Sequence, residues 1–204
     1  MRLTRRTVLA GGLAAATPAL ARTRTIVALG DSLTAGFGLR AGEAFPARLE
    51  ALLKAQGKDV AIRNAGLSGD TTAGGLARLA FATQAPVDGV MVGLGANDML
   101  QGRPVADARA NLDAILTRLR GRRLPVVLLG MRAPTNWGAD YQRAFDGLYP
   151  ALARKHGATL YPFLLDGVAL DPKLNQRDGI HPNAQGAALI ARRLAPVAIR
   201  AFSL

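Results

Sequence analysis

The sequence predicts one α/β domain, a three-layer α/β/α sandwich, and three observations support this fold class. Short runs of β-branched or apolar residues alternate with segments whose apolar residues recur at helical spacing. The runs are apolar on both faces, which is typical of a parallel sheet covered by helices on both sides. The 204 residues contain no internal repeat, low-complexity tract or linker, so a single domain accommodates them.

The first part of the domain contains two strands and two helices. Thr25–Leu29 (TIVAL) is an apolar run that predicts a buried strand, and a glycine follows it. Arg48–Gln56 has leucines at helical spacing, and Gly57 is placed to end that helix. Val60–Asn64 predicts the second strand, and Thr72–Ala82 predicts the helix that returns the chain to the start of the sheet.

The middle of the domain continues the alternation. Gly89–Leu94 (GVMVGL) is apolar throughout and predicts a fully buried third strand. Asp107–Arg120 places its alanine, leucine and isoleucine residues on one face, as an amphipathic helix does. Pro125–Leu129 (PVVLL) predicts the fourth strand.

The last part of the domain contains two helices around a short strand. Tyr141–Lys155 predicts a helix, Thr159–Pro162 a short fifth strand, and Ala184–Ala201 a closing helix with Asn183 as its N-cap. In sheets of this kind a ligand binds beyond the carboxyl ends of the strands. Reactive side chains are therefore expected directly after the predicted strands.

Residues 1–21 (MRLTRRTVLAGGLAAATPALA) predict an export signal that precedes a hydrolase domain at 22–204. A basic start is followed by the short apolar stretch Val8–Ala16 and by Ala19-Leu20-Ala21, a cleavage site of the A-x-A type. The pair Arg5-Arg6 adds a twin-arginine pattern, which predicts a periplasmic or secreted protein. The alternative for this segment is a frayed N-terminal helix.

Composition excludes several kinds of site. The chain has no cysteine and two histidines, so no metal site and no disulfide are expected. It carries 26 basic and 14 acidic residues, but the arginines are scattered over several predicted helices, which argues against nucleic-acid binding. The proposed mature chain has no apolar run long enough to span a membrane.

Four segments that follow strands or precede the last helix carry the chemistry. They read GDSL at 30–33, NAGLSGD at 64–70, GAND at 95–98 and DGIHPN at 178–183. A serine, a histidine and a carboxylate are the side chains that acyl transfer requires. The four segments therefore predict a serine hydrolase site at the carboxyl edge of the sheet.

Each of these residues has an expected role. Ser32 is the expected nucleophile, His181 the base that takes its proton, and Asp178 the carboxylate that orients the imidazole. A developing oxyanion needs preorganised donors, and the candidates are the backbone N–H groups of Ser32 and Gly69 and the side-chain amide of Asn97. No cofactor is expected, because these groups supply the chemistry.

Together the four segments resemble the SGNH/GDSL hydrolase family, which has serine, glycine, asparagine and histidine blocks in this order. The match is closest to its bacterial thioesterase/lysophospholipase/arylesterase branch. The resemblance implies a flavodoxin-like five-stranded parallel sheet of order 2-1-3-4-5, the same roles for Ser32, Gly69, Asn97, Asp178 and His181, and a small-molecule or lipid acyl ester as substrate. The third block departs slightly, since GAND stands where this branch often has GGND.

Several readings of single residues stay open. Ser32 could cap the helix after the first strand, and Asp31 is expected to hold the turn through backbone hydrogen bonds. His156 precedes a glycine and is expected at the end of a helix, not in the active site. Apolar side chains near the strand ends could line an acyl-binding groove or belong to the core, as with Leu33, Trp137 and Tyr141.

Two alternative functions also stay open. One is hydrolysis of O-acetyl groups on carbohydrates. The other is a non-catalytic binding module, because doubly wound sheets also serve as binding domains. The sequence does not decide the acyl chain, the leaving group or the oligomeric state.

Overall fold

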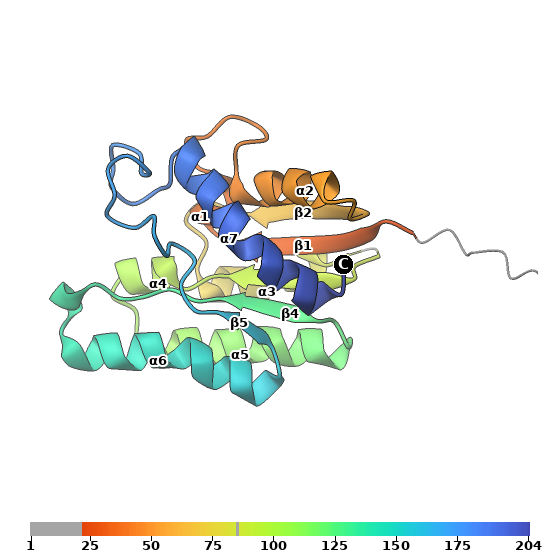
Figure 1. Cartoon of the computed structure of the whole chain (residues 1–204). Helices are drawn as coiled ribbons and strands as arrows, with labels where there is room; N and C mark the ends of the chain where they lie inside the picture. Colours follow the sequence, from red (N-terminus) through yellow and green to blue (C-terminus); the bar gives the residue numbers. More distant parts are fainter. Residues whose placement is uncertain (1–21, 85) are drawn as a thin grey trace, which may run out of the picture.

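A computed structural model describes residues 22–84 and 86–204, and its centre is a five-stranded parallel sheet between two layers of helices (Figure 1). Every strand pairs in parallel with its neighbours, in the order β2-β1-β3-β4-β5. Both the predicted sandwich and the predicted strand order are confirmed. The strands are β1 (Arg24–Gly30), β2 (Val60–Gly66), β3 (Gly89–Gly93), β4 (Val126–Leu129) and β5 (Thr159–Tyr161). The predicted export signal lies outside the described residues.

Five long helices cover the sheet. Helices α2 (Phe45–Ala55) and α7 (Ala184–Phe202) pack together on one face. The other face is covered by α3 (Thr72–Ala82), α5 (Val105–Gly121) and α6 (Ala139–His156). All five were expected, with ends that differ by a few residues. In the described part of the chain, no helix is both long and apolar enough to cross a membrane.

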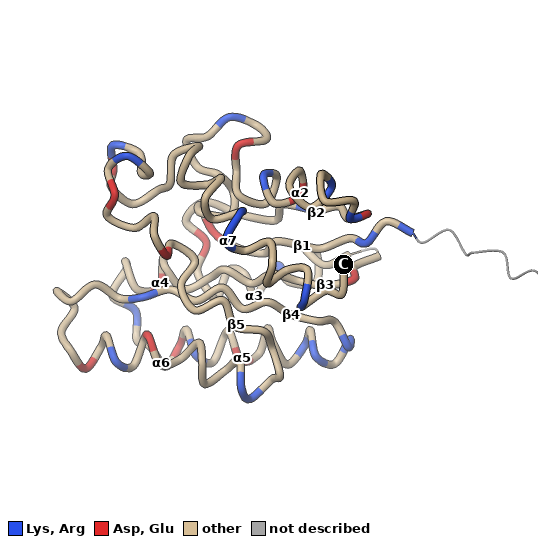
Figure 2. Tube along the Cα trace, in the orientation of Figure 1, with Lys and Arg blue, Asp and Glu red and all other residues tan. Residues whose placement is uncertain are grey.

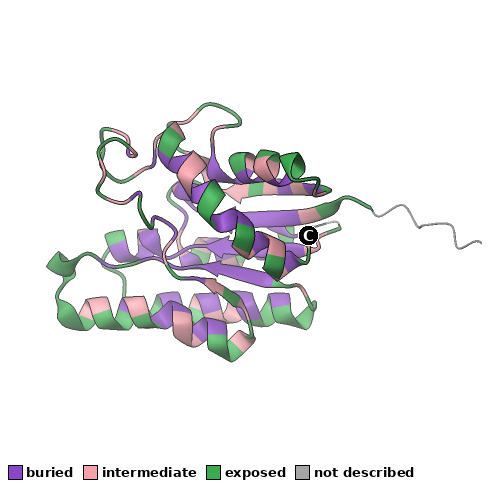
Figure 3. Cartoon of the chain, viewed as in Figure 1, coloured by how far each residue is buried: buried purple, intermediate pink, exposed green. Residues whose placement is uncertain are grey.

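The core lies between the sheet and these two layers. The middle strands β1 and β3 are almost wholly buried, which explains why their sequences are apolar on both faces (Figure 3). Helix α5 turns one stripe inward against the sheet, and that stripe consists of Ala108, Leu112, Ile115, Leu116 and Leu119. The pattern that predicted this helix is therefore the pattern of its buried face.

Three short elements at the carboxyl edge of the sheet were not delimited from the sequence. They are α1 (Ser32–Ala35) after β1, α4 (Ala96–Leu100) after β3, and the 3-10 helix η1 (Thr135–Trp137) after β4. Segments this short show no helical periodicity in the sequence. The turn before α1 requires glycine at position 30. A Cβ there would lie only 2.0 Å from the Thr34 hydroxyl oxygen, so a larger residue would clash.

Candidate active site

Ser32 is the first residue of α1, at the point where β1 leaves the sheet. The N-cap is Asp31, whose carboxylate oxygen Oδ1 accepts a hydrogen bond from the Leu33 N–H at 3.0 Å. Asp31 therefore caps the helix, in agreement with its expected role of holding the turn through backbone hydrogen bonds. The Ser32 hydroxyl does not serve as the helix cap and faces His181.

His181 links this serine to a carboxylate from the other end of the chain. Its Nε2 lies 2.9 Å from the Ser32 hydroxyl oxygen, and its Nδ1 lies 2.7 Å from Oδ2 of Asp178. All three side chains predicted for acyl transfer therefore meet in one line of hydrogen bonds. Ser32 and His181 are 149 residues apart in the sequence.

The turn that carries Asp178 and His181 is held by its own backbone. Oδ1 of Asp178 accepts hydrogen bonds from the N–H groups of Ile180 and His181, at 2.9 and 3.0 Å. The backbone hydrogen bond from His181 is the main reason that the pKa of Asp178 falls to about 2. Asp178 is therefore ionised at neutral pH, as a partner for a protonated imidazole must be.

Three hydrogen-bond donors lie beside Ser32. Gly69 has φ of +81°, a left-handed conformation that favours glycine. Within the described residues, the N–H groups of Ser32 and Gly69 donate to no carbonyl or side chain. The Asn97 side-chain Nδ2 donates one hydrogen to the Asp70 carbonyl at 2.8 Å, which leaves its second hydrogen for another acceptor. All three residues that the sequence predicts as oxyanion donors thus line the same cavity.

A network of buried polar contacts fixes the loops that carry these donors. The Arg78 guanidinium donates to the carbonyls of Gly30 and Ala65 and forms an ion pair with Asp70 at 2.7 Å. The buried carboxylate of Asp98 accepts hydrogen bonds from the N–H and the hydroxyl of Thr72, at 2.8 and 2.6 Å. These contacts join the ends of β1 and β2 to the starts of α3 and α4.

Arg78 and Thr72 had no role expected from the sequence. Their side chains act across loops that are distant in the sequence, so spacing alone could not identify them. One feature of the sequence could have suggested a role for them. Both residues lie on the helix that directly follows the Ser68-Gly69-Asp70 segment.

Asp31, which directly precedes Ser32, carries a buried carboxyl group. Burial is the main cause that raises its pKa to about 6, and the Leu33 backbone hydrogen bond opposes this rise. The same carboxyl interacts at longer range with His181 and Asp70. Its side-chain hydrogen bond is the helix cap, so its position supports the role of holding the turn.

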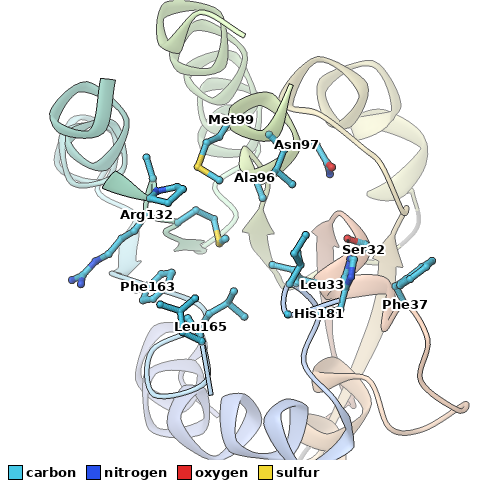
Figure 4. Close-up of a pocket in the computed structure, with 18 of the residues that line it drawn as sticks. Ser32, Leu33, Phe37, Ala96, Asn97, Met99, Arg132, Phe163, Leu165 and His181 are labelled. Carbon is cyan, nitrogen blue, oxygen red and sulfur yellow. Dashed lines mark hydrogen bonds between the residues drawn. The ribbon is translucent and has the colours of Figure 1, made fainter. Parts of the chain in front are cut away.

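Ser32 opens onto an apolar cavity of about 500 Å³ at the carboxyl edge of the sheet (Figure 4). Ser32 and His181 lie on one side of it, and Arg132 and Phe163 lie on the opposite side. Apolar residues from five separate loops and helices line the space between them, among them Leu33, Met99, Met131, Leu165 and Ala169. A flexible hydrocarbon chain attached to a carbonyl group near Ser32 would fit such a space.

Leu33 lines this cavity and also belongs to the buried core, so both of the roles left open for it remain. Trp137 and Tyr141 are not among the lining residues. Their rings stack on one another at 5.4 Å, and the Tyr141 hydroxyl donates to the Arg103 carbonyl at 3.3 Å. These two aromatic residues therefore form a separate stacked pair at the start of α6.

The second histidine lies elsewhere. His156 is the last residue of α6, and Gly157 caps that helix with φ of +66°. Its Nε2 lies 2.6 Å from Asp113 on α5. Across residues 22–84 and 86–204, no group of three or more histidine or carboxylate side chains could hold a metal ion.

Comparison with known proteins agrees with this geometry. The model of the GDSL-like lipase/acylhydrolase family matches residues 28–189. The chain belongs to this family. That segment begins within β1 and contains the other four strands of the sheet and the four sequence blocks, so the family match covers the whole site.

Relatives in the family are enzymes that act on esters. The chain is 39% identical to the esterase TesA of Pseudomonas aeruginosa over 163 residues, 79% of this chain and 81% of the relative. It is 40% identical to thioesterase 1/protease 1/lysophospholipase L1 of Escherichia coli K12 over 168 residues, 82% of this chain and 79% of the relative. The solved structure of AlinE4, an SGNH-hydrolase family esterase, matches with 46% identity and a TM-score of 0.75, covering 90% of this chain and 98% of that one.

The chain is accordingly a serine ester hydrolase of the GDSL-like family. Its departure in the third block has a simple explanation. Gly95, with φ of +117°, is the residue that requires glycine, whereas Ala96 is already in the first turn of α4. A methyl group at position 96 therefore fits the helix and lines the cavity.

Proposed function

We propose that this enzyme cleaves carboxylic esters or thioesters through an acyl intermediate on Ser32. The observation that carries the proposal is the line from Ser32 through His181 to Asp178, at 2.9 and 2.7 Å, beside an apolar cavity. A hydroxyl, an imidazole and an ionised carboxylate in this order form an activated nucleophile.

In the first half of the reaction, the Ser32 hydroxyl oxygen attacks the carbonyl carbon of the substrate, and its proton moves to Nε2 of His181. The carbonyl π electrons move to oxygen and form a tetrahedral intermediate. When the intermediate collapses, the bond to the leaving alcohol or thiol breaks, and His181 gives it the proton. Asp178 stabilises the imidazolium during this exchange and is not itself protonated.

In the second half, water attacks the acyl group on Ser32 and His181 accepts a proton from it. Collapse of the second tetrahedral intermediate releases the carboxylic acid and returns the proton to Ser32. In both halves the negative oxygen receives hydrogen bonds from the N–H groups of Ser32 and Gly69 and from the free hydrogen of the Asn97 amide. No cofactor or metal takes part in these steps.

The cavity supports an acyl group longer than acetyl. Its lining is almost entirely apolar, and an acetyl group would leave most of the 500 Å³ unfilled. Acyl chains of medium length would bury more apolar surface against residues such as Met131 and Leu165, with a gain of about 0.8 kcal/mol for each buried CH₂. This favours lipid-type esters and thioesters over O-acetylated carbohydrates.

We also propose that the enzyme acts outside the cytoplasm. Residues 1–21 would direct export by the twin-arginine route, with cleavage after Ala21. The mature enzyme would then begin at Arg22, two residues before β1.

The test is hydrolysis of p-nitrophenyl esters of increasing acyl length by the unsubstituted chain and by Ser32→Ala. We expect kcat/KM to rise from acetyl to medium chains, and the substitution to lower kcat by about 10⁴-fold or more. Ser203→Ala, at the C-cap of α7, is the matched control and should retain full activity. Full activity in Ser32→Ala would contradict the proposed nucleophile.

A further inference from the structure

Exposed apolar side chains gather at one edge of this molecule. In the described residues, seven large hydrophobic side chains are exposed, and six of them lie on loops or short helices at the carboxyl edge of the sheet. We call these six the apolar rim. Its members are Phe37, Leu67, Leu100, Trp137, Leu170 and Ile180. The seventh, Phe81, lies near the end of α3 at the opposite edge.

Lining the cavity does not account for the whole rim. Leu67 and Trp137 are 54% and 38% exposed, yet neither is among the cavity-lining residues. Leu170 does line the cavity, but it is 91% exposed and has a left-handed backbone with φ of +65°. A leucine rarely adopts this conformation, and here it holds an apolar side chain in water. An exposed apolar surface continuous with a cavity marks a surface that binds something.

Positive charge surrounds the apolar rim. Five exposed basic residues lie on the same loops, and none of them takes part in an ion pair within the described part of the chain. Figure 2 shows blue segments on the loops at this edge. The five are Arg40, Arg103, Arg132, Lys173 and Arg177.

Three exposed carboxylates near the rim have local partners, whereas Asp107 on the first turn of α5 forms no ion pair within the described residues. Asp166 forms an ion pair with Arg193, and Asp140 forms one with Arg143. Asp178 is bound to His181 in the active site. The charge that remains available to an approaching surface at this edge is therefore mainly positive.

We propose that the apolar rim docks on an anionic phospholipid surface, with the mouth of the cavity facing the lipid. Leucine, phenylalanine and tryptophan side chains enter the headgroup region of a bilayer, and nearby arginine and lysine side chains bind anionic headgroups. Docking in this orientation would let an ester pass from the lipid to Ser32 without crossing water. Binding to the lipid requires no hydrolysis, so this inference can be tested independently of the proposed acyl intermediate.

The chain contains one tryptophan, and it belongs to the apolar rim. Fluorescence of Trp137 therefore reports contact at this edge and at no other. The experiment uses the chain that begins at Arg22, which holds every described helix and strand, with Ser32→Ala to prevent lipid hydrolysis. Vesicles of phosphatidylcholine alone are compared with vesicles of phosphatidylcholine and phosphatidylglycerol.

With phosphatidylglycerol present, we expect a blue shift of the Trp137 emission, quenching by brominated lipid, and loss of binding as salt is raised. Leu170→Ser should weaken vesicle binding by about tenfold or more, because it removes a large apolar side chain from the lipid contact. Leu67→Ser should act in the same direction. The matched control is Phe81→Ser, which removes a 76% exposed apolar side chain at the opposite edge and should bind as the parent does.

Three results would overturn the proposal. One is an unchanged Trp137 emission together with no sedimentation of the chain with anionic vesicles. Another is equal loss of binding in Phe81→Ser and Leu170→Ser. The third is concentration-dependent self-association that Leu170→Ser abolishes, with no vesicle binding, which would assign the rim to a second copy of the chain.

Discussion

The chain has two histidines, and each lies against an aspartate at almost the same distance. His181 Nδ1 is 2.7 Å from Asp178, and His156 Nε2 is 2.6 Å from Asp113. The first pair lies at the carboxyl edge of the sheet on a turn before α7. The second lies at the opposite edge, between the end of α6 and the face of α5.

The two pairs differ in what the second ring nitrogen faces. For His181 it faces the Ser32 hydroxyl and an open apolar cavity. For His156 it is buried and has no hydrogen-bond partner among the described residues, and the side chain is only 5% exposed. A histidine–aspartate pair is therefore insufficient for catalysis, because a nucleophile and a substrate space must lie on its far side.

The largest expected difference comes from removing each histidine. His181→Ala should lower kcat by about 10⁴-fold or more, since no other group in the site can take the Ser32 proton. His156→Ala should leave kcat within about twofold and lower the free energy of unfolding by about 1–2 kcal/mol, because a buried side chain and its hydrogen bond to Asp113 are lost. Steady-state kinetics and urea denaturation of both variants measure this. Comparable kinetic losses in the two would refute the distinction.

The aspartates give a smaller contrast. Asp178→Asn should lower kcat by about 10³ to 10⁴-fold, because an amide cannot stabilise the imidazolium or hold the required tautomer. Asp113→Asn, which alters the pair at the other edge, should retain its kinetics. If Asp178→Asn kept its activity, the oriented imidazole would not be needed.

The third prediction concerns Asn97, one of the proposed oxyanion donors at the carboxyl edge of the sheet. Asn97→Ala should lower kcat by about 10² to 10³-fold with little change in KM, since its amide is proposed to bind the oxyanion only as it forms. Asn111→Ala is a suitable control, because that amide donates to the Thr72 hydroxyl and does not line the cavity. A rise in KM alone would assign Asn97 to substrate binding instead.

The smallest effect is on stability in acid. The pKa of Asp178 is lowered to about 2, so its ionised form stabilises the fold above the usual aspartate pKa near 4. That stabilisation is lost as the pH falls from about 4 to about 2. More than a third of the side chain is exposed, so the loss should stay below about 1 kcal/mol. Unfolding measured between pH 4 and pH 2 should show a shallower slope in Asp178→Asn, and an identical slope would contradict the assignment.

The fold could be predicted because the buried faces of its long helices and strands produce clear apolar patterns in the sequence. The stripe on α5 and the apolar strands β1 and β3 are periodic or continuous over many residues. The short helices α1 and α4 could not be delimited from the sequence, because the Asp31 cap and the turn at Gly95 create them, and no periodicity does. The order of the strands followed from the family resemblance and could not be derived from local pattern.

The site divides in the same way. Ser32, Asp178 and His181 could be found because acyl transfer needs those chemical types and they follow predicted strands or precede the last helix. The contacts of Arg78 could not be predicted in this way. Its partners at Gly30, Ala65 and Asp70 become neighbours only after folding. The sequence left Trp137 and Tyr141 open between an acyl-binding groove and the core, and in the structure they stack on one another outside the cavity lining.

The central claim is that Ser32 is the one activated serine of the chain. The most direct measurement is labelling with a fluorophosphonate, followed by peptide mass spectrometry of all three serines, Ser32, Ser68 and Ser203. We expect a single adduct on Ser32, formed much more slowly in His181→Ala and at the parent rate in His156→Ala. An adduct on Ser68 or Ser203, or an active enzyme that carries no label on Ser32, would contradict the account.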